Sequence, residues 1–208
     1  YQRTIPPLTL KAPTQMVFAG DLIAAGYPSG RLVMLSAANG AVRWDVPVTE
    51  PRGATEVERL ADVLGAPLVL GADVCAAAYQ GRVACFEIGN GNLRWARDLS
   101  AGNGLGGDVR RVYAVDAKSN VVAFASSSGA NAWRQEKLLN RSLTTPLALR
   151  RAVLVGDYAG YVHLLSPEDG AFLARVALGS RITATPREFG GGAIVQTQDG
   201  TVALLTLG

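Results

Sequence analysis

The chain has 208 residues, of which 49% are hydrophobic and 18% are charged, and its formal net charge is +3. The apolar content is enough for a buried core, and the charged content lies below the ~25% typical of globular domains. The weak, scattered positive charge argues against a nucleic-acid surface, and no apolar run reaches the roughly 18 residues that suggest a membrane-spanning helix.

The first residues predict an exposed connector. Pro6 and Pro7 are adjacent, and Leu8 and Leu10 then alternate with polar residues. These leucines either pack on a neighbouring part of the fold or face a partner. The start at Tyr1 does not have the basic and apolar regions of a signal peptide, and it is expected to be the tail of a strand from a preceding unit.

A pattern of an opening residue, an alternating run, a second glycine and an aromatic residue recurs along the chain. The copies open at Gly30, Gly81, Ser119, Gly160 and Gly200. Three of them reach a tryptophan, at Trp44, Trp95 and Trp133, and Ala174 takes that place in the fourth. A repeat of roughly 40 residues made of short strands is typical of a β-propeller blade.

The predicted fold is therefore all-β, a propeller of four-stranded antiparallel blades with about five blades present. The repeats are expected at residues 13–48, 67–99, 108–137, 146–178 and 186–207, and the glycine-rich residues 100–107 are expected to be a flexible connection. The tryptophans are predicted to plug the gap between one blade and the next. We expect a structural role for them and for the opening glycines Gly30, Gly81, Gly160 and Gly200.

Residues 49–66 are an insert that makes the first repeat longer than the others. Thr55 and Glu58 have the spacing of a capping box, and apolar residues follow at helical spacing. The segment also carries the charged residues Glu56, Arg59 and Asp62. It is either a solvated insert with one helical turn or a binding loop, since inserts in repeat arrays gather on one face.

The two cysteines, Cys75 and Cys85, lie on two strands joined by a short turn. A two-residue turn places their side chains on opposite faces, whereas a three-residue turn places them opposite each other. We favour two small buried thiols, and a disulfide stays the alternative.

Catalytic and metal-binding motifs are missing from the sequence. His163 is the only histidine, so a histidine-rich metal site is impossible, and its alternating run predicts a structural side chain. We expect no catalytic residue, no metal and no cofactor.

The repeat resembles the pyrroloquinoline-quinone type, which quinone-dependent dehydrogenases share with the non-enzymatic BamB family of outer-membrane assembly lipoproteins. The dehydrogenases have adjacent cysteines and clustered calcium ligands, and this chain has neither pattern. Three stretches resemble BamB: residues 7–11, the insert at 53–63, and residues 138–146 followed by 155–163.

This resemblance implies the C-terminal portion of an eight-bladed ring, preceded in the whole protein by about three blades and a lipidated cysteine. It implies a scaffold at the periplasmic face of the outer membrane that docks on the POTRA domains of BamA and meets other assembly subunits and unfolded outer-membrane proteins. The docking residues it implies are Leu8, Leu10, Lys11 and Asp62, with Glu56 and Arg59 on the same insert. The rival interpretations are a quinone-dependent oxidoreductase and a ligand-sensing propeller.

Overall fold

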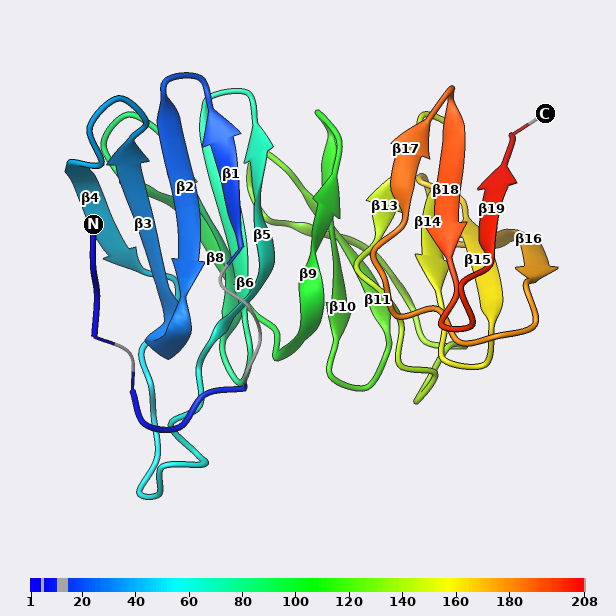
Figure 1. Ribbon diagram of the computed structural model, residues 1–208, viewed down its shortest axis with the longest axis horizontal. Helices are drawn as coiled ribbons and strands as arrows, with labels where there is room; N and C mark the ends of the chain where they lie inside the picture. Colours follow the sequence, from blue (N-terminus) through cyan, green and yellow to red (C-terminus); the bar gives the residue numbers. More distant parts are fainter. Residues whose placement is uncertain (5, 11–14, 208) are drawn as a thin grey trace. The chain divides into compact units, whose positions relative to one another are not determined.

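The structure, a computed structural model, describes residues 1–4, 6–10 and 15–207. Their regular structure is almost entirely antiparallel β-sheet (Figure 1), which confirms the predicted all-β class. The chain forms two compact units, residues 1–105 with 127–129, and residues 106–126 with 130–208.

The first unit holds two four-stranded sheets, each built from consecutive hairpins. The first sheet has the order β1-β2-β3-β4, with strands β1 (Met16–Ala19), β2 (Leu22–Tyr27), β3 (Arg31–Ser36) and β4 (Val42–Pro47), and one 3-10 turn, η1 (Pro28–Gly30). The second sheet has the order β5-β6-β7-β8, with β5 (Val63–Leu70), β6 (Asp73–Ala78), β7 (Arg82–Glu87) and β8 (Leu93–Asp98).

The third and fourth sheets repeat this four-stranded plan, and the fifth has three strands. The third contains β9 (Ala101–Gly107), which runs across the boundary between the units, β10 (Arg111–Asp116), β11 (Val121–Ala125) and β12 (Asn131–Gln135). The fourth contains β13 (Leu147–Ala148), β14 (Val153–Gly156), β15 (Tyr161–Leu165) and β16 (Phe172–Ala177). The fifth contains β17 (Arg187–Phe189), β18 (Gly192–Gln196) and β19 (Val202–Leu205). The opening glycines Gly30, Gly81, Gly160 and Gly200 lie at or just before the third strand of their sheets.

The cores lie between neighbouring sheets of one unit. In the first unit, side chains such as Leu32 and Met34 pack with Val74 and Phe86 of the next sheet. In the second unit, Tyr113 and Val121 pack with Val153 and Leu165 in the same way. In the first four sheets the strands of the middle hairpin are largely buried on both faces, which is why β6 and β10 read as nearly continuous apolar runs.

The expectation of a flexible connection at residues 100–107 is wrong, because Ala101–Gly107 form strand β9. The glycines allow neighbouring backbones to approach closely. A Cβ on Gly65 would lie 2.6 Å from the Gly104 Cα, and one on Gly106 would lie 2.1 Å from the Pro146 carbonyl oxygen. Glycine in a strand often marks such a close backbone approach.

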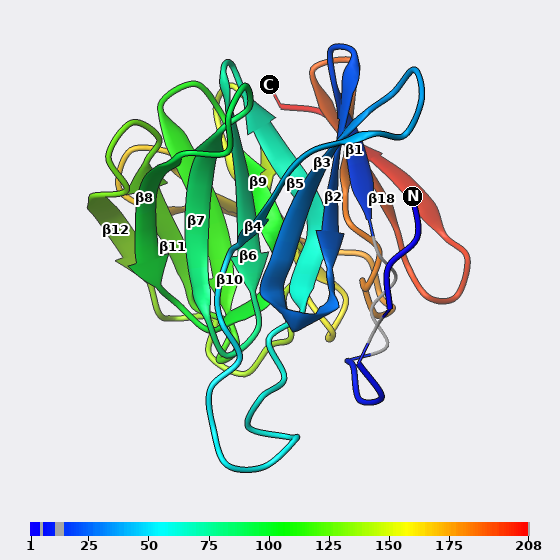
Figure 2. The same ribbon diagram turned by 90° about the vertical axis from the view of Figure 1, so that its left-hand side faces the viewer.

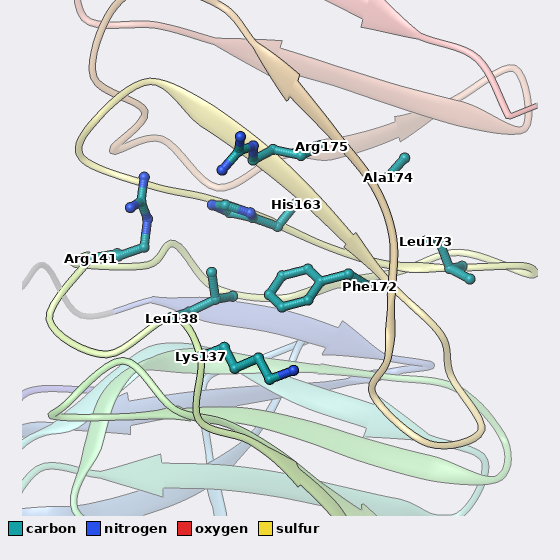
Figure 3. Close-up of a pocket in the computed structure, with 8 residues that line it drawn as sticks. All are labelled: Lys137, Leu138, Arg141, His163, Phe172, Leu173, Ala174 and Arg175. Atoms are coloured by element: carbon teal, nitrogen blue, oxygen red, sulfur yellow. The ribbon is translucent and has the colours of Figure 1, made fainter.

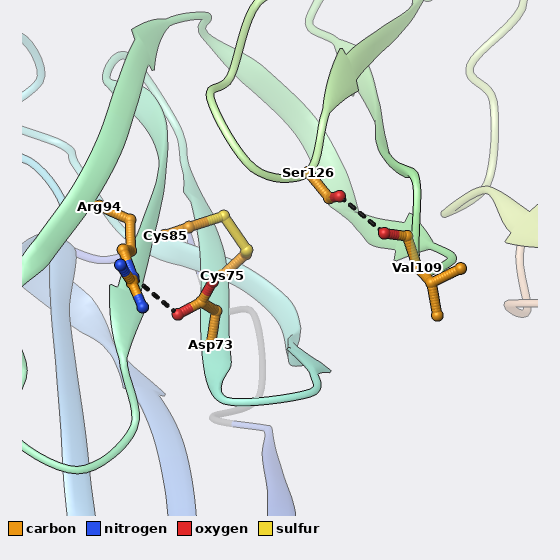
Figure 4. Close-up of a disulfide and its surroundings, with 6 residues drawn as sticks. All are labelled: Asp73, Cys75, Cys85, Arg94, Val109 and Ser126. Carbon is orange, nitrogen blue, oxygen red and sulfur yellow. Dashed lines mark hydrogen bonds and ion pairs between the residues drawn. A yellow bond between two sulfur atoms is a disulfide. The ribbon is translucent and has the colours of Figure 1, made fainter.

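The preference for free thiols is also wrong, because Cys75 and Cys85 form a disulfide (Figure 4). The register pairs Ala77 with Val83, so the turn between β6 and β7 contains three residues, 79–81. The two cysteines are therefore directly opposite each other, with their Cα atoms 4.0 Å apart. The sequence left the turn length open, and the turn length decides which faces the side chains take.

Candidate functional site

The N-terminal residues and the insert lie together at one end of the first unit. Figure 2 shows the insert looping away from the strand ends, with the N-terminal segment beside it. The insert joins β4 to β5, which begins at Val63, inside the segment expected to be insert. Leu8 and Leu10 belong to the N-terminal segment. We call residues 6–10 of this segment, together with the insert at residues 49–62, the loop site.

Asp62 joins the two loops. Its side chain is buried, with 4% of the residue exposed. Oδ2 accepts a hydrogen bond from the Leu10 N–H at 2.7 Å, and Oδ1 accepts one from the Ser29 N–H at 3.2 Å. The carboxylate therefore holds the leucine-bearing segment against the first sheet and is not itself displayed to a partner.

The insert contains the predicted capping box. Glu58 Oε2 accepts hydrogen bonds from the N–H groups of Ala54 and Thr55, and Thr55 Oγ1 accepts one from the Glu58 N–H at 3.3 Å. Hydrogen bonds from the Thr55 and Ala54 N–H groups lower the pKa of Glu58 below its ordinary value. Only a turn forms here, not a helix, and Arg59 closes it by donating from Nε to the Gly53 carbonyl at 3.0 Å.

These loops enclose a cavity of about 190 Å³. Its lining is apolar with a charged rim: Pro6, Pro7, Leu8, Ser29, Pro51, Glu56, Arg59, Leu60 and Asp62. Leu8 and Leu10 are 39% and 36% exposed, and Val57 on the insert is 61% exposed. Exposed apolar side chains surrounded by a polar rim are typical of a protein-binding patch.

The structure brings most of the predicted docking residues together. Leu8, Glu56, Arg59 and Asp62 line the one cavity, and Leu10 is tied to it through its N–H. Lys11 lies outside the described residues. The role of Asp62 as an internal anchor could not be seen in the sequence, because it depends on hydrogen bonds to residues 52 and 33 positions away.

The predicted structural tryptophans lie at contacts between sheets. The Trp44 ring lies against Gly91, and its Nε1 donates to the Ile88 carbonyl at 2.8 Å. Trp133 lies against Gly170 in the same way, and its Nε1 donates to the Pro167 carbonyl at 2.8 Å.

His163 is buried beside a carboxylate that sequence reasoning did not assign to it. Its Nε2 lies 2.8 Å from Asp157 Oδ2, and the two side chains are 2% and 0% exposed. Arg141 Nε donates to the same oxygen at 2.5 Å. Burial lowers the pKa of His163 against the opposing effect of Asp157, and Arg141 and Arg175 lower it further.

Asp157 remains the charged member of this pair. Burial by itself raises its pKa, but hydrogen bonds from His163, the Tyr161 N–H and Arg141 outweigh burial and bring the pKa below its ordinary value. The imidazole is therefore neutral near pH 7, with Nε2–H donating to the carboxylate. Asp157 directly follows β14, and its position before a turn is the only sequence signal for this arrangement.

Among residues 1–4, 6–10 and 15–207 there is no group of three or more His, Cys, Asp or Glu side chains that could hold a metal ion. The same residues include no helix with the length and apolar character needed to cross a membrane.

Comparison with known proteins gives a consistent result. A family model described as "Outer membrane protein assembly factor BamB" matches residues 1–135 and 117–207. The chain is 45% identical over 98% of its length to a protein of that name from Bordetella pertussis, and 32% identical over 97% of its length to the one from Escherichia coli K12. It covers 53% and 52% of those two proteins, so the chain spans about half the length of the curated relatives it matches.

Solved structures give the same picture. The crystal structure of BamB from Moraxella catarrhalis matches with a TM-score of 0.91 and 25% identity, over 100% of this chain and 62% of that one. The computationally designed Ika8 protein matches with a TM-score of 0.74 and 15% identity, over 92% of this chain and 57% of that one, which is a likeness of fold alone.

Proposed function

This chain belongs to the family of outer membrane protein assembly factor BamB, and from that premise we propose that it is a non-enzymatic binding scaffold in outer-membrane protein assembly. The observation that carries the proposal is the loop site, where the N-terminal leucines and the insert are joined by Asp62 around one cavity. Its partner is the set of POTRA domains of BamA. Other assembly subunits and unfolded outer-membrane proteins are further partners of the whole protein.

The proposed location is the periplasmic face of the outer membrane, with a lipid anchor in the whole protein. The disulfide between Cys75 and Cys85 supports a place outside the cytosol, because disulfides persist in oxidising compartments such as the bacterial periplasm.

The proposed mechanism is association by burial of apolar surface. Leu8 and Leu10 expose more than a third of their surface, and a partner that covers them gains about 25 cal/mol for each Å² of apolar area removed from water. The charged rim, with Glu56 and Arg59, sets the orientation of the partner, since rim charges act mainly on specificity and association rate. The family resemblance gives Lys11 the same role. Asp62 is a positioning residue that keeps the leucines in place.

Capture of purified BamA POTRA domains tests this proposal. We expect Leu8→Ala with Leu10→Ala to weaken capture by roughly tenfold or more, because alanine removes the apolar anchors. Leu93→Ala with Val42→Ala is the matched control, since these side chains of the same unit are 52% and 46% exposed and lie outside the loop site. Circular dichroism verifies that every variant keeps its sheet content.

Asp62→Ala separates positioning from direct contact. We expect weaker capture together with faster amide hydrogen exchange at Leu10 and Ser29, whose N–H groups lose their acceptor. Unchanged capture by the double leucine variant, or equal weakening by the control pair, contradicts the proposal.

A further inference from the structure

A second hollow lies in the second unit, on the face of the fourth sheet that carries His163. It has a volume of about 420 Å³. Its walls come from the segment after β12 and from β15 and β16, and we call it the basic groove after its main residues, Lys137, Leu138, Arg141, His163, Phe172 and Arg175 (Figure 3).

The repeats show that this groove departs from the scaffold. Four sheets share a bulge beside the tryptophan position, which aligns them residue by residue. The place of His163 is taken in the other three sheets by Val33, Ala84 and Val122, all of which are buried aliphatic residues. A polar, titratable side chain at this place is therefore not required by the fold.

The ion pairs beside the groove in the fourth sheet also differ from those at the same place in the third sheet. In the third sheet Arg134, which takes the place of Arg175, is paired with Asp116 at 2.7 Å. In the fourth sheet the corresponding carboxylate of Asp157 is occupied by Arg141 and His163.

Arg175 instead lies over an aromatic ring. Its guanidinium carbon lies 4.8 Å from the centre of the Tyr161 ring, and that of Arg141 lies 5.5 Å from the same centre. In the part of the chain that the structure describes, neither Arg175 nor Lys137 has a carboxylate partner. The basic groove thus holds three cationic side chains against one carboxylate.

The rest of the groove is apolar. Phe172 and Leu173 are 41% and 56% exposed, and the Phe172 ring centre lies 6.0 Å from that of His163. His163 Nδ1 is buried and has no hydrogen-bond partner among the described residues. As the neutral imidazole donates from Nε2, this nitrogen is an acceptor.

We propose that the basic groove binds an extended polypeptide segment in which a carboxylate side chain stands beside an apolar one. The carboxylate pairs with Arg175 and Lys137, and the apolar side chain covers Phe172 and Leu173. Guanidinium groups bind carboxylate and phosphate alike, but the exposed apolar wall of Phe172 and Leu173 favours a peptide, which can supply an apolar side chain beside the carboxylate. This site is in the second unit and does not depend on the loop site.

Fluorescence anisotropy with a labelled peptide, Gly-Asp-Phe-Asp-Leu-Gly, tests the proposal. We expect saturable binding that is lost when both aspartates are replaced by asparagine. Arg175→Gln and Lys137→Gln should each weaken binding by about fivefold or more, because each removes a charge from the groove. Arg150→Gln, an equal charge change at an exposed turn residue outside the groove, should leave binding unchanged.

Inorganic phosphate is added as a competitor in a parallel titration. Failure to displace the peptide supports the proposal, and displacement at equal concentration assigns the groove to a phosphate ligand and overturns it. No saturable binding of the aspartate peptide, or equal weakening by Arg150→Gln, also overturns it. Lys137→Gln, at an exposed position in the connection after β12, decides the matter if Arg175→Gln does not fold.

Discussion

Single residues at the contacts between sheets combine a large ring with the smallest side chain. Trp44 lies against Gly91, Trp95 against Gly129 and Trp133 against Gly170, and each of these glycines has a positive φ. The glycine meets two demands at once, because it tolerates that backbone conformation and leaves room for the ring. The position of the ring is thus fixed by a turn that belongs to the following repeat.

Alanine substitutions separate these two demands. Gly129 (φ 66°) and Gly71 (φ 60°) have similar backbones, but a Cβ on Gly129 would lie 2.4 Å from the Trp95 ring, and one on Gly71 would meet nothing within 4 Å. We expect Gly71→Ala to lower the free energy of unfolding by about 1–2 kcal/mol, for the left-handed conformation alone. Gly129→Ala should lose about 1–3 kcal/mol more, since overpacking forces the ring to shift. Urea denaturation followed by tryptophan fluorescence measures both, and equal losses would show that the ring contact carries no energy.

His163 makes stability depend on pH. Its pKa is lowered in the folded state, so the unfolded chain binds more protons once the pH falls below the ordinary histidine value of about 6.5. The stabilisation is complete above that pH and is lost as the pH falls towards the folded pKa. Its surroundings are Asp157, Arg141, Arg175 and the Tyr161 ring.

We expect the free energy of unfolding to decrease between pH 7 and pH 5, and His163→Val to flatten that decrease. Valine is the residue at the matching place of the first and third sheets. The pKa of Asp157 is lowered, so this carboxylate contributes its own loss only below about pH 4. Since His163 is the only histidine, an unchanged slope in the variant would contradict the assigned shift.

Among the secondary-structure elements, the hairpin of β6 and β7 is held together both by strand pairing and by a disulfide. Strands β6 and β7 pair along their length, and the disulfide joins Cys75 to Cys85 across them, ten positions apart in the sequence. The link restricts the unfolded chain more than the folded one, where the two cysteines already face each other.

Removing this link should cost about 2–3 kcal/mol of unfolding free energy, from the entropy of closing a loop of this size. Cys75→Ala with Cys85→Ala is a mild change, because both residues are small and buried. A reductant should lower the unfolding midpoint of the original protein to that of the double variant and leave the variant unaffected. A reductant that shifts both midpoints, or neither, would rule out a stabilising disulfide.

For the molecule as a whole, the class of fold could be predicted from the amino-acid sequence alone. The repeat consists of a glycine, an alternating run, a second glycine and a tryptophan. It recurs because each small sheet needs turns, two apolar faces and a large side chain at the contact with the next sheet. Those are local demands, met within some 40 residues. The same local reasoning identified the capping box of Thr55 and Glu58 and the charged insert.

Features that depend on distant residues, or on a shift of one residue in strand register, became visible only in the folded chain. A three-residue turn paired Cys75 with Cys85, and close backbone neighbours made β9 a strand in spite of its glycines. Asp62 became an anchor because Leu10 and Ser29 direct their N–H groups at it, and Asp157 met His163 and Arg141 together. Such contacts join segments whose approach is set by the packing of whole sheets, and the spacing of residues along the chain does not encode it.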